Sequence, residues 1–308
     1  MSKVDVIIPF FNTPIIYVRA AIDSLLAQTV KDWEAIIIDD ASSPANAGEM
    51  RSLLDSYKDI RFTLIRTDHK GPAGSRNAGI EISNSPLIAF LDSDDIWYPE
   101  KLARQIAALE ANTDVGLVHG NYQFVNADGS PIRTDMAKGF LNGLSSVDLF
   151  AEMLKENYVA TSSVVLRRQL GAQVGFFDNS FPCIVDKDLW LRLLSQGCLF
   201  WYDSAVLIDY RMHSSNISKR VDILRSTRIK LISKVDELIK ANPSLQAVGW
   251  KPLKKQMIRH TYIEASEGYL EKNDYREALR YSLPHYSGLS LRAGFLAARS
   301  LYRWLCAA

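Results

Sequence analysis

The first 120 residues alternate apolar runs with segments whose apolar residues recur at helical spacing. Residues 4–10 are almost continuously apolar, which is typical of a strand buried on both faces of a sheet. Residues 14–28 then carry Ile15, Val18, Ala21 and Leu25 on one face of a predicted helix. The pattern also predicts strands at 34–38, 62–65, 86–90 and 115–119, helices at 45–57 and from about 98, and a loop turning into a helix over 71–79. Such alternation predicts an α/β fold with a mostly parallel sheet and helices on both faces.

The pattern changes in the second half of the chain. Residues 122–132 favour β-structure with a turn at 126–129, and they are followed by a helix at 146–155 and a strand at 161–166. A helix is predicted at 186–195 and a strand at 198–210. Beyond residue 218 nearly everything favours helix, including a hairpin over 262–281 that is broken at 272–274. We therefore expect a domain boundary near residue 218.

Both acidic clusters of the first half follow predicted strands. Asp39 and Asp40 end one strand, and Asp92, Asp94 and Asp95 come directly after another. Ligands of such sheets bind at the carboxyl ends of the strands, so both clusters fall where a site is expected. Crowded carboxylates need a cation or hydrogen-bond donors, and Mg²⁺ or Mn²⁺ binds carboxylates together with substrate phosphates. The alternative is an acidic strand end that caps the next helix.

Composition narrows the class of protein without identifying it. The chain has 308 residues, of which 47% are hydrophobic and 23% charged, as expected for a globular protein with a sizeable core. A net charge of +1 does not favour nucleic-acid binding. The three cysteines have neither metal-ligand spacing nor a disulfide framework, which fits a reducing compartment. Neither a signal peptide nor a membrane span is predicted, so we expect a cytoplasmic protein, with peripheral membrane contact left open.

Four segments, in this order along the chain, resemble motifs of the family 2 glycosyltransferases. They are 6–12 (VIIPFFN), 38–43 (IDDASS), 75–79 (SRNAG) with 90–95 (FLDSDD), and 186–192 (DKDLWLR). Members of this family are inverting, nucleotide-sugar-dependent enzymes with a GT-A fold. The resemblance covers roughly residues 3–218. It implies a GT-A (Rossmann-like) catalytic domain over 1–218, followed by a helical C-terminal extension over 219–308.

The resemblance assigns the donor-binding role to residues in the first three segments. Pro9 is assigned to the nucleotide-sugar site. Phe11 offers a flat face for a nucleobase, and the alternative for Phe11 is a core aromatic. Asp40 can accept a hydrogen bond from a base N–H, which favours a uridine or thymidine donor. Arg76 can bind phosphate oxygens or form an internal salt bridge to Asp92 or Asp40.

The same resemblance implies a divalent cation, Mn²⁺ or Mg²⁺, that bridges the donor phosphates. Asp94 is the expected metal ligand, and His213, in the closing segment Tyr-Arg-Met-His, can complete the shell. Asp92 is assigned to the ribose hydroxyls or to an indirect metal contact, and Ser93 to the donor site. Asp95 is either a further ligand or the cap of the next helix.

An inverting transfer needs a base that takes the proton of the acceptor hydroxyl. In this family the base is commonly the aspartate of a Glu-Asp pair at a helix start. Asp186 keeps the aspartate, while Val185 replaces the glutamate. Asp188 is the competing carboxylate, although the first turn of a helix favours acidic residues for its dipole alone.

The resemblance therefore implies transfer of a sugar from a UDP- or dTDP-linked donor to a hydroxyl of a glycan or lipid-linked glycan. Two alternatives remain from other classes of protein. One is a degenerate transferase that serves as a scaffold through its C-terminal helices. The other is a sugar nucleotidyltransferase, which would be expected to have a basic glycine-rich loop after its first strand, where this chain has Pro9-Phe10-Phe11-Asn12.

The C-terminal tail after Glu277 contains no acidic residue. On a helix, three arginines fall on one face and apolar residues on the other: Arg292, Arg299 and Arg303 against Leu291, Ala298, Leu301, Trp304 and Leu305. Such a helix can lie on anionic lipid at the inner face of a cell membrane. The alternatives are a docked C-terminal helix and a contact in a homodimer.

Overall fold

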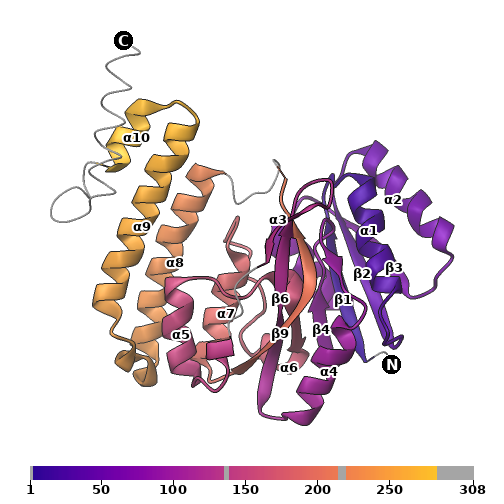
Figure 1. The fold of residues 1–308 in the computed structure, drawn as a ribbon, viewed down its shortest axis with the longest axis horizontal. Helices are drawn as coiled ribbons and strands as arrows, with labels where there is room; N and C mark the ends of the chain where they lie inside the picture. Colours follow the sequence, from indigo (N-terminus) through magenta and orange to yellow (C-terminus); the bar gives the residue numbers. More distant parts are fainter. Residues whose placement is uncertain (1–2, 135–138, 214–219, 283–308) are drawn as a thin grey trace. The chain divides into compact units, whose positions relative to one another are not determined.

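Figure 1 shows the computed structural model of the protein, which describes residues 3–134, 139–213 and 220–282. The chain divides into two compact units, Met1–Ser214 and Ser215–Ala308, and each is described by itself. The boundary expected near residue 218 and the tail helix expected over 287–308 both lie outside the described residues.

The described part of the first unit is built on one nine-stranded sheet. Its order is β3-β2-β1-β4-β8-β6-β9-β5, and β7 pairs with β6 outside this path. The strands are β1 (Val4–Phe10), β2 (Trp33–Asp40), β3 (Phe62–Thr67), β4 (Leu87–Phe90), β5 (Ile96–Trp97), β6 (Val115–Val125), β7 (Pro131–Thr134), β8 (Val164–Arg167) and β9 (Leu199–Arg211). Strands β3, β2, β1, β4, β6 and β9 run in one direction, whereas β8, β5 and β7 run the opposite way. The predicted α/β class with a mostly parallel sheet is confirmed.

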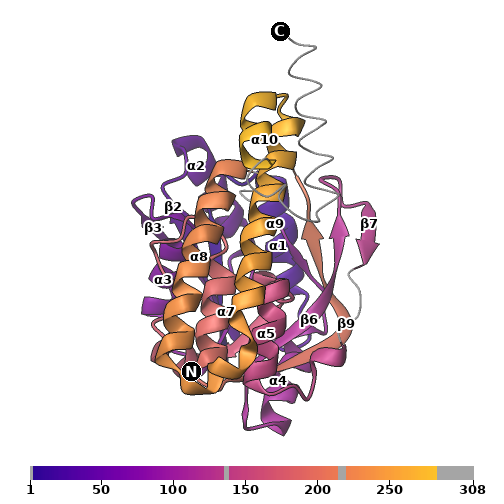
Figure 2. The ribbon, with the colours of Figure 1, turned by 90° about the vertical axis from the view of Figure 1, so that its left-hand side faces the viewer.

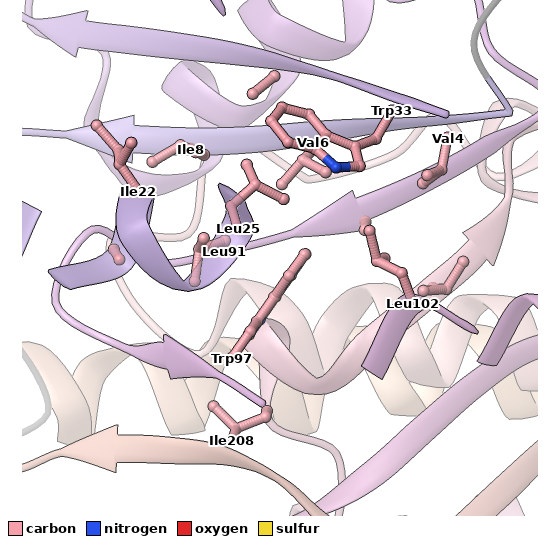
Figure 3. Packing of buried hydrophobic residues seen from close by; sticks show 14 of the residues in the cluster. Val4, Val6, Ile8, Ile22, Leu25, Trp33, Leu91, Trp97, Leu102 and Ile208 are labelled. Atoms are coloured by element: carbon pink, nitrogen blue, oxygen red, sulfur yellow. The ribbon is translucent and has the colours of Figure 1, made fainter. Parts of the chain in front are cut away.

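Helices cover both faces of this sheet (Figures 1 and 2). They are α1 (Ile15–Leu26), α2 (Pro44–Tyr57), α3 (Gly71–Ile82), α4 (Lys101–Ala111), α5 (Ser146–Lys155), α6 (Arg168–Gln173) and α7 (Val185–Ser195), with 3-10 turns η1 (Gly139–Leu141) and η2 (Thr161–Ser163). Helices α1, α2 and α4 share one core with the sheet, in which Leu25, Trp33 and Trp97 are completely or almost completely buried (Figure 3). Helix α3 packs on the other face, where a Cβ at Gly79 would lie only 2.6 Å from Ile38 Cδ1.

Three predicted elements begin elsewhere than expected, and β5 and α6 were not predicted. Residues 71–74, expected as a loop, form the first turn of α3, because Asp40 accepts hydrogen bonds from the backbone N–H groups of Lys70 and Gly71. The helix expected from about 98 begins at Lys101, after the two-residue strand β5. The strand expected from 161 begins at Val164, because residues 161–163 form the turn η2.

Lys101, at the start of α4, is completely buried. Its Nζ lies 3.8 Å from the centroid of the Trp97 ring and donates a hydrogen bond to Gln105 Oε1 at 2.8 Å. Burial lowers the pKa of Lys101 well below its usual value, because the charged amine loses its hydration. The unfolded chain therefore binds this proton more tightly than the folded protein does.

We expect this lysine to make stability depend on pH. The free energy of unfolding should rise by up to about 1.4 kcal/mol per pH unit between the lowered pKa of Lys101 and about pH 10.4, the unfolded value, and then level off. Urea unfolding at a series of pH values should show this rise in the wild type and its loss in Lys101→Met. The exposed Lys31→Met is the control, and an identical pH profile for wild type and Lys101→Met would contradict the prediction.

The second unit is helical throughout its described part. It contains α8 (Val221–Ala241), the 3-10 segment η4 (Pro243–Val248), α9 (Trp250–Glu271) and α10 (Tyr275–Ser282). The predicted break of the hairpin at 272–274 is confirmed, and Tyr269 and Tyr281 stack across it with ring centroids 5.4 Å apart. Over the described ranges of the chain, no helix is long and apolar enough to cross a membrane.

Candidate active site

The predicted metal ligands come together although 119 residues separate them in the chain. Asp94 lies in the loop after β4, and His213 lies two residues past the end of β9. His213 Nε2 is 2.6 Å from Asp94 Oδ2. The His213 ring stacks on Tyr17 of α1 at 5.9 Å, and Arg211 Nε donates to the backbone oxygen of Asp94 at 2.9 Å. Both members of the pair are partly exposed, so a ligand can reach them.

Asp92 faces a buried arginine. Arg76, on α3, donates through Nη2 to Asp92 Oδ1 and through Nη1 to the Pro72 carbonyl oxygen, so the internal salt bridge foreseen as the alternative is present. Arg76 Nε is buried without a hydrogen-bond partner among the described residues. Burial, followed by repulsion from Asp94 and Asp186, raises the pKa of Asp92, while Arg76 acts in the opposite direction.

Asp95 points into the protein. Its carboxylate accepts hydrogen bonds from Ser162 Oγ at 2.5 Å and from the Arg211 backbone N–H at 3.0 Å. Burial and the carboxylates of Asp94 and Asp92 raise its pKa well above the usual value. Because α4 begins only at Lys101, the helix-cap interpretation of Asp95 is wrong. The side chain instead ties the acidic loop to η2 and β9.

An exposed pair of rings lies at the carboxyl ends of β1 and β3. Phe11 is 48% exposed, which excludes the core-aromatic alternative, and its ring centroid lies 4.5 Å from that of His69. His69 Nδ1 in turn lies 3.0 Å from Asp40 Oδ2. Sequence reasoning missed His69. Its signal was an imidazole four residues past a predicted strand, at the same sheet edge as the acidic clusters.

Asp40 also has a structural role in this chain. Its buried carboxylate accepts hydrogen bonds from Thr67 Oγ1 at 3.1 Å and from the backbone N–H groups of Lys70 at 2.7 Å and Gly71 at 2.9 Å. The neighbouring Asp39 pairs with Arg66 and accepts the Ser42 backbone N–H. Of these two carboxylates, Asp40 is the one that contacts His69.

The remaining predicted donor residues are Pro9, in strand β1, and Ser93, in the acidic loop after β4. Pro9 is half-buried in β1, in register with Ile38 of β2. Ser93 is buried, and its Oγ is 2.8 Å from Thr13 Oγ1 in the loop after β1. That hydrogen bond joins the acidic loop to the loop that carries Phe11.

Asp186 and Asp188 have different surroundings although both lie in the first turn of α7. Asp186 is half-buried, and its Oδ2 accepts a hydrogen bond from Asn157 Nδ2 at 2.8 Å. Asp188 is 1% exposed and pairs with Arg192, whose nitrogens lie 2.7 and 2.9 Å from Asp188 Oδ2. Asp188 is thus committed to a buried ion pair, while Asp186 keeps a carboxylate oxygen for another partner.

The acidic side chains influence one another, which places them in one site. Repulsion from Asp186 helps to raise the pKa of Asp92. Burial, followed by the charges of Asp95, Asp92, Asp94 and Asp186, raises the pKa of the Tyr210 hydroxyl well above its usual value. The site therefore combines the Asp186 carboxylate, of which Oδ2 is held by Asn157, with an Asp–His pair and a region of strong negative potential.

The donor atoms at Asp94 and His213 fit a divalent cation that is shared with a substrate. Mg²⁺ and Mn²⁺ accept carboxylate oxygens, and Mn²⁺ also accepts imidazole nitrogen, with phosphates and water filling the other positions. Over the residues that the structure describes, no group of three or more His, Cys, Asp or Glu side chains is arranged to hold a metal. A cation here would thus depend on ligand atoms from the substrate.

Residues 5–170 match the model of the family described as glycosyl transferase family 2. The chain is 31% identical over 255 residues to the UDP-Glc:alpha-D-GlcNAc-diphosphoundecaprenol beta-1,3-glucosyltransferase WfaP of Escherichia coli. The aligned region covers 82% of this chain and 88% of that relative. It is 28% identical over 220 residues to an uncharacterized glycosyltransferase of Rickettsia felis, a match over 71% of this chain but only 35% of that longer protein.

The fold is also similar to that of a solved structure. The mannosyltransferase PcManGT from Pyrobaculum calidifontis, in complex with GDP-Man and Mn²⁺, matches 99% of this chain and 81% of its own with a TM-score of 0.62 and 16% identity. At that identity the match concerns the fold alone. The family model covers more than half of this chain. The chain therefore belongs to glycosyl transferase family 2.

Proposed function

We propose that the protein is an inverting glycosyltransferase that moves a sugar from a nucleotide-diphosphate donor to a hydroxyl of a glycan or lipid-linked glycan. The catalytic domain would comprise residues 1–218, with 219–308 as a helical extension. The observation that carries the proposal is the convergence of Asp92, the Asp94–His213 pair and Asp186 at one site. A nucleotide sugar needs a cation at its diphosphate, which Asp94 and His213 would hold, and its acceptor needs a base, for which Asp186 is the candidate.

The donor would lie along the carboxyl ends of β1, β2 and β3. Phe11 and His69 offer ring faces to the base, and Asp40 beside them is the proposed acceptor for a base N–H. This arrangement favours uridine or thymidine, whose bases present such an N–H. Pro9 and Ser93 would line the nucleoside, and Asp92 would bind the ribose hydroxyls. Arg76, which pairs with Asp92, would contribute positive charge close to the diphosphate.

Asp186 would act as the base. As the acceptor hydroxyl attacks the anomeric carbon, its proton moves to the Asp186 carboxylate, and the bond from that carbon to the diphosphate oxygen breaks. Asn157 keeps Asp186 oriented, and the ion pair of Asp188 with Arg192 supports the choice of Asp186. Asp94 and His213 would hold Mn²⁺ or Mg²⁺, which neutralises charge on the departing nucleoside diphosphate.

The similarity to the E. coli enzyme supports a narrower version of this proposal. That relative is named for transfer of glucose from UDP-Glc to an alpha-D-GlcNAc-diphosphoundecaprenol acceptor. UDP-glucose and a lipid-linked GlcNAc diphosphate are accordingly the first donor and acceptor to test.

The test is a thermal-shift screen of nucleotide sugars with and without Mn²⁺, followed by transfer assays with the donor that binds. A ligand that binds the native state raises its melting temperature, by an amount that grows with its concentration. We expect stabilisation by UDP- or dTDP-sugars that depends on Mn²⁺. Stabilisation by no nucleotide sugar, with or without metal, would contradict the proposal.

Because a lipid-linked acceptor lies in a membrane, the C-terminal tail, residues 287–308, would serve to bind the protein to the inner face of the cell membrane. Deleting residues 287–308 should release the protein from anionic vesicles and spare transfer to a soluble acceptor. Each basic residue contributes about 1 kcal/mol near an anionic surface, so binding should also weaken as salt rises. Vesicle co-sedimentation at low and high salt measures this, with Arg292→Gln/Arg299→Gln/Arg303→Gln as the charge-only variant. If the full-length protein stays in the supernatant at low salt, the prediction is wrong.

A further inference from the structure

A row of aromatic residues crosses the far half of the sheet. Phe124 on β6 is in register with Tyr210 on β9 and with Arg133 on β7, so the three side chains share one face. Tyr122, two residues before Phe124, lies on that face as well. The ring centroids of Tyr122 and Phe124 are 5.3 Å apart, those of Phe124 and Tyr210 are 5.7 Å apart, and Arg133 lies over Phe124 at 4.5 Å. We call these four residues the aromatic row.

One end of the row reaches the active site. The Tyr210 hydroxyl is within the field of Asp92, Asp94 and Asp186. The next residue, Arg211, donates its backbone N–H to Asp95 and its Nε to the Asp94 carbonyl oxygen. From there the row leads across β6 to the exposed strand β7; Figure 2 labels these strands.

The proposed donor site lies on the other side of the acidic loop. Phe11, Asp40 and His69 follow β1, β2 and β3, which occupy one end of the sheet order, whereas β6, β9 and β7 lie beyond β8. An acceptor has to approach the anomeric carbon from the side opposite the leaving diphosphate. The aromatic row and the proposed donor site lie on opposite sides of the acidic loop. An acceptor bound on the row can therefore approach the anomeric carbon from the side opposite the diphosphate.

The row has the chemistry of a sugar-binding surface. Tyr122, Phe124 and Tyr210 are half-buried, so they are held by packing and still present ring area to solvent. The C–H face of a pyranose stacks on such rings, and the Tyr210 hydroxyl can hydrogen-bond a sugar hydroxyl. Within the described ranges Arg133 has no ion pair and Tyr210 has no hydrogen bond through its hydroxyl. A guanidinium at the outer end of the row suits a phosphate.

We propose that the aromatic row binds the acceptor, with its sugar ring on Phe124 and Tyr210 and its phosphate at Arg133. This inference rests on the proposed glycosyltransferase function and adds to it the surface that would bind a glycosyl phosphate or diphosphate acceptor. The sugar hydroxyl that reacts would then point from the row toward Asp186.

The experiment titrates the full-length protein with two probes, methyl α-GlcNAc and α-GlcNAc diphosphate carrying a short alkyl chain, by saturation-transfer NMR. Phe124→Leu should weaken both probes by about tenfold, because it removes one stacking face. Arg133→Gln should weaken only the diphosphate probe. UDP-glucose binding should stay within about twofold of wild type in both variants, since the row lies outside the donor site. Trp201→Leu, an exposed aromatic of β9 outside the row, is the matched control and should bind both probes normally.

The outcomes separate this inference from the proposed function. Unchanged probe affinity in folded Phe124→Leu, or no binding of either probe to wild type, overturns the acceptor assignment. Loss of both probes in Phe124→Leu with normal UDP-glucose binding supports it. If wild type binds the probes through the row but transfers no sugar to them, the proposed function fails and the binding site stands.

Discussion

Replacing Asp186 with Asn should lower kcat by about 10²- to 10⁴-fold, the usual contribution of a general base. The substitution keeps the shape of the side chain and its contact with Asn157 but removes the basic oxygen. Donor binding should stay within about twofold of wild type, because the change leaves untouched the residues proposed to bind the donor's nucleobase and diphosphate. Single-turnover transfer and calorimetric titration with the donor measure the two quantities separately.

The control is the neighbouring carboxylate. Asp188→Asn leaves Arg192 without its buried ionic partner, although that guanidinium also donates to the Val174 and Phe176 carbonyl oxygens. Breaking a buried pair costs about 3–5 kcal/mol, so this variant should have a lower melting temperature. Any activity it loses should follow the loss of folded protein. A stable but inactive Asp188→Asn beside an active Asp186→Asn would show that the wrong carboxylate was chosen.

The elements that sequence patterns predicted well are those whose patterns reflect burial. Strands β1 and β2 are almost continuously apolar because the sheet is covered on both faces. Helix α1 has apolar residues at helical spacing because one face of it packs on the sheet. Strand β5 was missed because two residues cannot show a period, and Trp97 joins the sheet only through its pairing with Ile208. The three-residue turn η2 depends on tertiary contacts as well, since Trp97 Nε1 donates to the Ser162 carbonyl oxygen.

The residues of the candidate site likewise fall into those that local sequence indicated and those that depend on contacts distant in the chain. The two acidic clusters of its first half were found because one ends a strand and the other directly follows one, so local sequence already indicated their place at the sheet edge. Pairing of Asp94 with His213 had no local signal and came from the family resemblance. His69, Asn157 and Ser162 were missed because each acts through a partner that is distant in the chain. Single polar residues of this kind acquire a role only when the fold brings their partners to them.

Asp94→Ala should abolish transfer and remove the dependence of UDP binding on Mn²⁺. The Asp94 carboxylate faces His213 at 2.6 Å, and a cation held there would depend on both side chains and on the donor phosphates. Loss of the carboxylate leaves one protein ligand, so phosphate charge near Asp92 and Asp186 would go unbalanced. Calorimetry with UDP in Mn²⁺ and in EDTA should give different affinities for wild type and equal, weak affinities for the variant.

Two further variants make this result specific. Asp114→Ala removes an exposed carboxylate just before β6, at the edge of the sheet opposite the acidic loop. This variant should retain the metal dependence of wild type. His213→Ala should weaken the Mn²⁺ effect without eliminating it, because a carboxylate and phosphates still suit the ion. If Asp94→Ala is folded and binds UDP with the same Mn²⁺ dependence as wild type, the metal does not bind at the Asp94–His213 pair. The charge of the leaving diphosphate would then have to be neutralised by the chain's own cations, such as Arg76, which pairs with Asp92.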